Sequence, residues 1–474
     1  MTVAIRTAKS TQWRAMRQIT PVCLKTLRMG LLIALCCMMG LGGPWTRTAR
    51  AQSGQLSLIR DAEVEDTIRL YATPLFEAAR LDPDSIKIHI VDEDVINAFV
   101  AGGRHMFLFT GMLFESEDPN TVIGVIAHET GHIAGGHLSK LRGAYEDASA
   151  IAILSAVLGV AVGVLGGGGA GVMASGQGVA ERNFYAFSRT QESSADQAGL
   201  SYLNATRQSA RGLLALMEKL SESELLVSSS QDPYMLTHPL SRERIQAIQA
   251  FIDRSPWSDT PEPPELIERH HRMLAKLFGF LKEPRQTLIR YPESDQSVAA
   301  RYARSIAYHK EHLDEQAYAT IDGLIAEEPD NGYFWEVKGQ FLFEDGRYDE
   351  SVTALREATR LIPGQSLILQ LLARVLTERA APGDAAEAVE VLNLAMRTED
   401  DDPSAWMLLG KAYTLQENLP MADLASAEFA YLVGREEEAR VKAERASQGL
   451  TSGTAEWLRA QDILAVTTPI EDDS

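Results

Sequence analysis

Residues 122–134 of the chain read VIGVIAHETGHIA, an apolar helical segment that holds His128 and His132 with Glu129 next to the first. Residues four apart on a helix lie about 40° apart around its axis, so both imidazoles face the same side. Two histidines placed this way can bind one zinc ion, and the glutamate can take a proton from a water that attacks a carbonyl. The flanking apolar residues favour a partly buried metal site over a solvated polar face.

A zinc centre of this kind needs a third protein ligand and an open position for water. His137 is one candidate, but it stands five residues after His132, where the pattern with a third histidine requires six. On a continued helix His137 would lie about 140° from His132, which favours a structural role. Glu192 is the other candidate, with Asp196 on the same helical face one turn later. Asp196 can then accept a hydrogen bond from a ligating imidazole and fix its tautomer.

The residues before the histidine helix predict a small sheet. Apolar spacing predicts one helix and three strands, at residues 56–79, 86–91, 95–100 and 105–110. Asp118-Pro119 is typical of a helix start, with Asp at the N-cap and Pro at the first helical position. We expect a substrate peptide to add as an extended strand along one of the segments between Val95 and Thr110, with Phe107 and Phe109 as test positions.

The first 51 residues hold eight Lys or Arg and no Asp or Glu. An uncharged run from Met29 to Trp45 and the small-x-small pattern at Ala49-Arg50-Ala51 predict a secretory signal peptide, cleaved after Ala51, and export to a bacterial periplasm. A retained membrane anchor is the alternative. Cys23, Cys36 and Cys37 all lie in this segment, so the exported chain would contain no thiol and no disulfide.

The rest of the chain is acidic, with 37 Lys or Arg against 65 Asp or Glu and a net charge of −28. This balance argues against nucleic-acid binding, because the chain repels phosphate backbones. Residues 148–180 contain no charged residue, and their strongly apolar part ends near Leu165. That length favours a buried or peripheral membrane-surface helix followed by a Gly-rich loop over a spanning helix, which would make the protein an integral membrane protease.

A repeat begins after the prolines at 256–264. Pro329 and Pro363 stand 34 residues apart, the period of a tetratricopeptide repeat, and Pro403 precedes a partial copy. The residues that fit its pattern are Trp335, Gly339, Leu342, Gly346, Tyr348, Leu355, Ala358, Trp406, Gly410 and Tyr413. The longer second interval requires an insertion near residues 380–384. Generic helical hairpins are the alternative, and His270-His271 near the linker are expected to be solvated.

Further motifs accompany the histidine pair. They are Asn97-Ala98-Phe99, Gly111-Met112-Leu113, Ala127 through His132, His137, Ser188-Arg189, Glu192-x-x-Ala195-Asp196 and His238-Pro239-Leu240. Together they resemble metallopeptidase family forty-eight, the zinc gluzincins, and the whole chain is similar to periplasmic members with tetratricopeptide repeats. The resemblance implies that Glu192 is the third zinc ligand, Glu129 the catalytic base and Asp196 a supporting residue. It also implies a role in outer-membrane protein quality control, with the β-barrel assembly machinery as partner.

The predicted fold is mainly α, of the α+β class: a zincin-like metallopeptidase domain with a small β-sheet, followed by an α-helical tetratricopeptide-repeat solenoid. The predicted divisions are a signal peptide at 1–51, the zinc metallopeptidase domain at 52–255, a linker with connecting helices at 256–295, the repeats at 296–465 and an acidic tail at 466–474. We expect the repeats to bind partners and to be dispensable for the peptide-bond chemistry. The alternative is that they pack against the peptidase domain and help to shape its cleft.

His238 has three interpretations. Its segment can be a plain loop entering a helix, or a loop over the metal that supplies a fourth ligand and keeps the enzyme latent, or a donor to the oxyanion of the tetrahedral intermediate. Two functions remain open. The first is a zinc endopeptidase, with one zinc per chain, that acts on unfolded or misassembled exported polypeptides. The second is a chaperone or assembly adaptor for outer-membrane proteins with a largely latent peptidase domain.

Overall fold

The structure is a computed structural model that describes residues 57–137, 189–226 and 238–468. The predicted signal peptide, the uncharged segment 148–180 and all but the start of the predicted acidic tail lie outside the described residues. Among the helices that are described, none combines the length and the hydrophobicity needed to cross a membrane.

A small mixed sheet precedes the histidine helix. Its strands are β1 (Leu58–Ile59), β2 (Lys87–Val91), β3 (Ala98–Ala101) and β4 (His105–Phe109). They lie in the order β1-β2-β4-β3, with β2 parallel to β4 and the other pairs antiparallel. β3 is therefore an edge of the described sheet, whereas β4 has a partner on both sides. This corrects the proposed test positions Phe107 and Phe109, which lie on an interior strand with no free edge.

The first helix starts later than its apolar spacing predicts. Residues 58–59 pair with β2 instead, and Asp61 caps α2 (Ala62–Ala78) by accepting a hydrogen bond from the Val64 N–H at 2.9 Å. The other elements of this half are η1 (Pro83–Ser85), α3 (Thr110–Phe114), α4 (Pro119–Ala134), α8 (Arg189–Ala205), α9 (Arg211–Leu226) and α11 (Arg242–Ile252).

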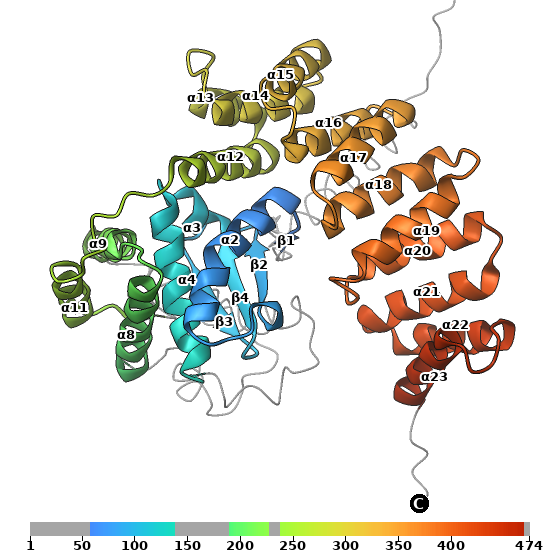
Figure 1. The fold of residues 1–474 in the computed structure, drawn as a ribbon, viewed down its shortest axis with the longest axis horizontal. Coiled ribbons are helices and arrows are strands. Elements are labelled where there is room, and N and C mark those ends of the chain that lie inside the picture. The colour runs from blue at the N-terminus through green and yellow to red at the C-terminus, as the bar shows by residue number, and fades with distance from the viewer. Residues whose placement is uncertain (1–56, 138–188, 227–237, 469–474) are drawn as a thin grey trace, which may run out of the picture. The chain divides into compact units, whose positions relative to one another are not determined.

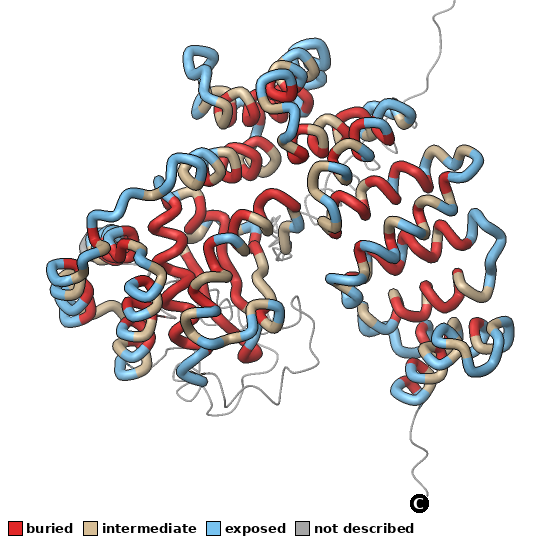
Figure 2. Tube along the Cα trace, in the orientation of Figure 1, coloured by how far each residue is buried: buried red, intermediate tan, exposed pale blue. Residues whose placement is uncertain are grey.

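The histidine helix α4 begins as predicted, because the Asp118 side chain accepts from the Thr121 N–H and Pro119 occupies the first position. It packs against α2 on one side and against α8 and α9 on the other (Figure 1). Figure 2 shows that it is buried along almost its whole length. The metal-binding motif therefore lies in the hydrophobic core of this half of the chain.

Two glycines allow α4 and α8 to approach closely. A Cβ atom on Gly131 of α4 would lie 2.5 Å from the carbonyl oxygen of Ala195. A Cβ atom on Gly199 of α8 would lie 2.9 Å from the carbonyl oxygen of Ala127. Both distances are too short for a real side chain, so the backbones touch where the two helices cross. This contact brings Glu192 and Asp196 on α8 within reach of the histidines on α4.

The second half is a run of paired helices. They are α12 (Pro264–Leu281), α13 (Pro284–Arg290), α14 (Val298–Lys310), α15 (Asp314–Glu327), α16 (Gly332–Glu344), α17 (Tyr348–Leu361), α18 (Ser366–Arg379), α19 (Asp384–Ala395), α20 (Pro403–Leu415), α21 (Leu419–Leu432), α22 (Glu436–Gly449) and α23 (Ala455–Thr467). From α14 onward each helix packs against the next, which confirms the repeat architecture. The insertion expected near residues 380–384 is wrong in its place. The turn at 380–383 between α18 and α19, where Ala380 and Gly383 have φ of 48° and 94°, is only one residue longer than the turn at 345–347 between α16 and α17. The longer connection is formed by residues 396–402 between α19 and α20.

The expectation that His270-His271 is solvated is wrong for His270. Its side chain is fully buried on α12, with ring nitrogens 3.2 Å from the Tyr71 hydroxyl and 3.0 Å from the Ser116 carbonyl oxygen. Burial lowers the pKa of His270 to about 4, so this imidazole is neutral and serves the packing of α12 against α2 and α3.

Candidate metal centre

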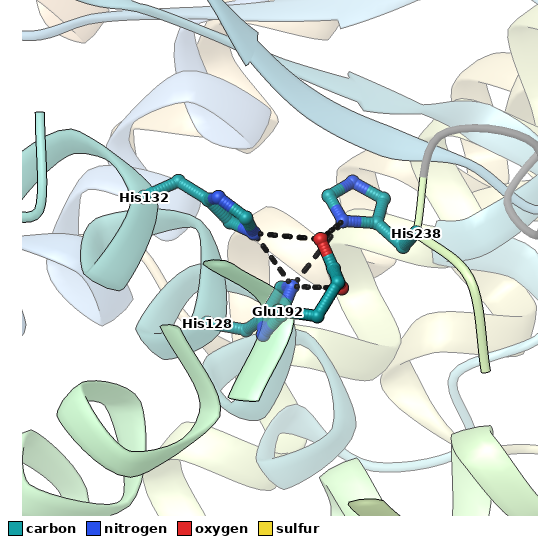
Figure 3. A group of neighbouring side chains, drawn as sticks. All are labelled: His128, His132, Glu192 and His238. Atoms are coloured by element: carbon teal, nitrogen blue, oxygen red, sulfur yellow. Dashed lines mark hydrogen bonds and ion pairs between the residues drawn. The ribbon is translucent and has the colours of Figure 1, made fainter. Parts of the chain in front are cut away.

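Four side chains from three parts of the chain converge on one point (Figure 3). His128 and His132 come from α4, Glu192 comes from the first turn of α8, and His238 comes from the loop before α11. All four are fully buried. The structure thus brings together the two predicted histidine ligands, the predicted third ligand and the loop histidine.

The spacing of their polar atoms fits a tetrahedral metal ion. His128 Nε2 lies 3.1 Å from His132 Nε2, 3.5 Å from Glu192 Oε2 and 3.3 Å from His238 Nδ1. Glu192 Oε1 lies 3.3 Å from His132 Nε2 and 3.2 Å from His238 Nδ1. Ligand atoms at the corners of a tetrahedron with metal bonds of about 2.0–2.2 Å are separated by about 3.3–3.6 Å. These residues therefore fit a bound divalent ion.

Neighbouring acceptors set the tautomers of two of these histidines. His128 Nδ1 lies 2.9 Å from Asp196 Oδ1, and His238 Nε2 lies 3.2 Å from the carbonyl oxygen of Ala98. Both oxygens accept hydrogen bonds, so the facing nitrogens carry the protons. The lone pairs of His128 Nε2 and His238 Nδ1 are left to face the centre of the cluster. Asp196 thus has the contact predicted for a residue that orients a ligand.

The site attracts a cation. Burial lowers the pKa of His128, but hydrogen bonds to Asp196 and Glu192 outweigh it and raise the pKa to about 10. Burial, together with the charge of His128, lowers the pKa of His132 to about 3. The same anions that favour positive charge on His128 favour a metal cation between the two rings. Neutral His132 is the form that a metal ion binds.

Glu129 lies beside the cluster rather than in it. Its side chain is fully buried, and neither carboxylate oxygen has a hydrogen-bond partner among the described residues. Oε1 lies 3.3 Å from His238 Nε2. Burial raises the pKa of Glu129, because the charged form loses its hydration. A carboxylate with free lone pairs and a raised pKa is suited to accept a proton.

His137 is not a member of the cluster. α4 ends at Ala134, so the assumption of a continued helix does not hold, and the chain turns back instead. His137 Nδ1 then lies 3.0 Å from Nδ1 of His132, on the far side of that ring from Glu192. His137 therefore contacts a candidate ligand, whereas its spacing on a continued helix predicted that it would face away from His132. Its structural role stays a prediction.

Arg244 is the residue that sequence reasoning missed. It is 2% exposed on α11, and its guanidinium donates to both oxygens of Asp196, at 2.6 and 2.8 Å. Nη1 lies 2.7 Å from Glu192 Oε2 and also donates to the Pro239 carbonyl oxygen at 3.0 Å. Arg244 therefore holds the candidate third ligand, the orienting carboxylate and the His238 loop together. The sequence feature that could have indicated this role is the helix start at Ser241, because it places Arg244 in the first turn of a helix that packs against α8.

We predict that Arg244→Met weakens metal binding by roughly 10- to 100-fold, the usual cost of removing a residue that orients ligands. Glu192 and Asp196 would otherwise remain buried without their cation. Metal content after dialysis against a graded chelator series measures the effect. Arg242→Met, an exposed arginine on the same helix, is the matched control. Equal metal affinity in both variants would contradict the role given to Arg244.

Comparison with known proteins gives two family matches and several relatives. Residues 59–252 match peptidase family M48, and residues 342–412 match the tetratricopeptide repeat. The Beta-barrel assembly-enhancing protease of Escherichia coli (strain K12) is 24% identical over 432 residues, covering 89% of this chain and 86% of that protein. The protein of the same name from Yersinia pestis is 23% identical over 446 residues, covering 91% and 88%.

A shorter relative matches the first half. Metalloprotease LoiP of Escherichia coli (strain K12) is 29% identical over 167 residues, covering 35% of this chain and 62% of that protein. These three relatives thus all carry the name of a protease. Together with the buried His and Glu cluster, these matches show a peptidase family M48 domain at residues 59–252 and a tetratricopeptide repeat at residues 342–412, and they support metalloendopeptidase activity.

Proposed function

We propose that this protein is a zinc-dependent endopeptidase of the bacterial periplasm that degrades misfolded or misassembled outer-membrane proteins. The observation that carries the proposal is the convergence of His128, His132 and Glu192 with Glu129 beside them. Two histidines and one glutamate are the ligand set of a catalytic zinc site. Similarity over most of the chain to proteases named for enhancing β-barrel assembly supports the substrate class and the β-barrel assembly machinery as partner.

In this mechanism His128, His132 and Glu192 hold the metal, and Asp196 orients His128. Zinc, when bound, supplies Lewis-acid chemistry that polarises the scissile carbonyl and makes water acidic. Glu129 accepts the proton of the attacking water and returns it to the leaving amine. Its raised pKa suits both steps, because the same group must act first as a base and then as an acid.

The edge strand β3 is our candidate for the substrate contact. Phe109 N–H donates to the Asn97 carbonyl, so alternate residues of β3 point their main-chain groups toward β4. The groups of Ala98 and Val100 therefore point away from β4, to the side on which no described strand pairs with β3. The Ala98 carbonyl lies 3.2 Å from His238 Nε2, which places this edge beside the candidate centre. A peptide added to β3 would be bound through its backbone, which suits an enzyme that accepts many unfolded sequences.

His238 supports a latent state. Its Nδ1 is the fourth candidate ligand atom of the cluster. Its Nε2 lies within hydrogen-bonding distance of the Ala98 carbonyl oxygen, which points away from β4. A catalytic water would need the position of Nδ1, and a substrate strand would need the Ala98 carbonyl as a hydrogen-bond acceptor. We therefore favour His238 as a displaceable fourth ligand over a plain loop residue, and donation to the oxyanion is open to it once the loop has moved.

We predict that Glu129→Gln retains its metal and lowers peptide cleavage by about 10²–10⁴-fold, because the proton acceptor is lost while the ligands stay. Zinc content by mass spectrometry and hydrolysis of a quenched fluorescent peptide measure the two properties on one preparation. Glu192→Ala is the counterpart and should lose the metal. Cleavage by Glu129→Gln at the wild-type rate would exclude this mechanism.

We predict that Val100→Pro raises KM for an unfolded substrate roughly 2- to 10-fold, the effect of one lost main-chain hydrogen bond. The N–H of Val100 points away from β4, so the hydrogen bonds between β3 and β4 stay intact. Val100→Ala keeps the N–H and controls for the smaller side chain. If both variants have the same KM, peptides do not bind along β3.

We predict that His238→Ala increases basal cleavage about tenfold or more, because a latched enzyme populates its open state at only about 0.1–10%. Initial rates on a short peptide, at matched zinc content, measure the change. A fall in kcat instead would assign His238 to the oxyanion and would contradict latency.

The full burial of the site also gives weight to a second function. All of His128, Glu129, His132 and Glu192 are inaccessible to solvent. A protein that spends most of its time in this state would act mainly as a chaperone or assembly adaptor through its repeats. Complementation of an assembly defect by Glu129→Gln separates the two, since an adaptor needs no general base.

A further inference from the structure

A buried lysine links the peptidase half to the repeats. Lys276 on α12 is 1% exposed, and its Nζ lies 2.8 Å from Asp61 Oδ2 and 2.6 Å from Glu336 Oε2. Asp61 is the N-cap of α2, and Glu336 lies on α16 in the repeats. One ammonium group thus joins three helices that are far apart in the sequence.

Neighbouring contacts repeat this pattern. Glu63 in the first turn of α2 is fully buried and pairs with Arg272 of α12 at 2.7 Å. It also accepts a hydrogen bond from the Tyr302 hydroxyl on α14 at 3.1 Å. The Tyr333 hydroxyl of α16 donates to Asp66 Oδ2 at 2.7 Å. The start of α2 is therefore bound by polar contacts to two successive repeats.

The cluster depends on its cations. Asp61, Glu63 and Glu336 are three acidic groups around Lys276 and Arg272. Removing one partner of a buried ion pair leaves an uncompensated charge, which is strongly unfavourable. Apolar packing of Ala62 with Tyr333, Ala358 and Ile368 adjoins the cluster. The contact is thus a specific buried interface rather than a set of surface ion pairs.

The other side of α2 contacts the candidate metal helix. Val64, Ile68 and Leu75 of α2 share one hydrophobic core with residues of α4, among them Val122, Val125 and Ile126. α4 carries His128 and His132 directly after this apolar stretch. α2 is therefore packed between the repeats at its start and the metal-binding helix along its length.

We propose that Lys276 is a positioning residue that fixes the first repeats to α2, and through α2 holds α4 and its histidines in place. The repeats are then part of the unit that forms the metal centre, and not a separable recruitment module. This inference rests on the proposed function only in taking His128 and His132 as metal ligands. It selects the alternative in which the repeats pack against the peptidase domain.

The test compares full-length wild type, Lys276→Met and Lys338→Met. Lys338 lies on α16, the helix that carries Glu336, and its ion pair with Asp322 is partly exposed. Lys338→Met therefore controls for the loss of a lysine. Hydrogen exchange of α2 and α4 and the rate of zinc loss to a chelator are measured. We expect both to rise roughly 2- to 30-fold in Lys276→Met, the range for coupling through a packed network. Lys338→Met should match wild type.

A second change makes the effect specific to charge. In Lys276→Met/Glu336→Gln one of the unpaired acids is neutralised, so exchange and zinc loss should return toward wild type. The kcat for a short peptide should follow the same order, with KM unchanged, because β3 is not altered. A merely structural lysine would lower the amount of folded protein without this reversal.

Wild-type exchange in α2 and α4 and wild-type zinc loss in folded Lys276→Met would overturn the proposal. If Lys276→Met does not fold, Glu336→Gln is measured in the same way. Wild-type hydrogen exchange in that variant would also contradict the proposal. A wild-type protein without zinc or peptidase activity would count against the proposed function instead. Hydrogen exchange would still test the coupling of Lys276 to α4 in that case, because this measurement requires neither zinc nor peptidase activity.

Discussion

The backbone contact between α4 and α8 is the constraint on which the site depends. Gly131 and Gly199 leave no room for a side chain where the helices cross, so the two backbones meet. Only at this separation can Glu192 Oε1 come within 3.3 Å of His132 Nε2. Gly131 lies inside the histidine motif itself, between the two candidate ligands on the chain. The motif therefore encodes both the ligands and the helix packing that brings in the third one.

The close contact creates an electrostatic problem that the rest of the site resolves. Glu129, Glu192 and Asp196 are three carboxylates buried in a small volume. Burial raises the pKa of Asp196, but hydrogen bonds from Arg244 and His128 hold it at about 2, so this group stays ionised. Arg244 balances Asp196 and part of Glu192, and a metal cation would balance the remainder. Glu129 has no such cation within hydrogen-bonding distance, and its pKa rises instead. The pKa values of Asp196 and Glu129 therefore shift in opposite directions because their neighbours differ.

Local patterns predicted the parts of this structure that local physics determines. The cap at Asp118-Pro119, the period-two strand before it and the paired histidines depend on residues within a few positions of one another. Arg244, the late start of α2 and the burial of His270 could not be predicted in that way. Each depends on a partner far along the chain: Asp196 for Arg244, β2 for residues 58–59, and Tyr71 for His270. Glu192 could be proposed as a ligand from the sequence because its spacing to Asp196 is local. Its contact with α4 depends on residues far apart in the chain.

Closure of the site and attachment of the repeats are two aspects of one arrangement. The His238 loop enters α11, where Arg244 ties it to Asp196 and Glu192, so the loop cannot leave the centre without straining contacts around the ligands. On the opposite side α4 rests on α2, whose start is held by Lys276 and the repeats. The repeats therefore contact α2 at its start, and α2 in turn packs against the helix that carries His128 and His132. The proposed function requires a site that stays closed to folded proteins, and the contacts of Arg244 and of Lys276 hold the elements of the closed site from two sides.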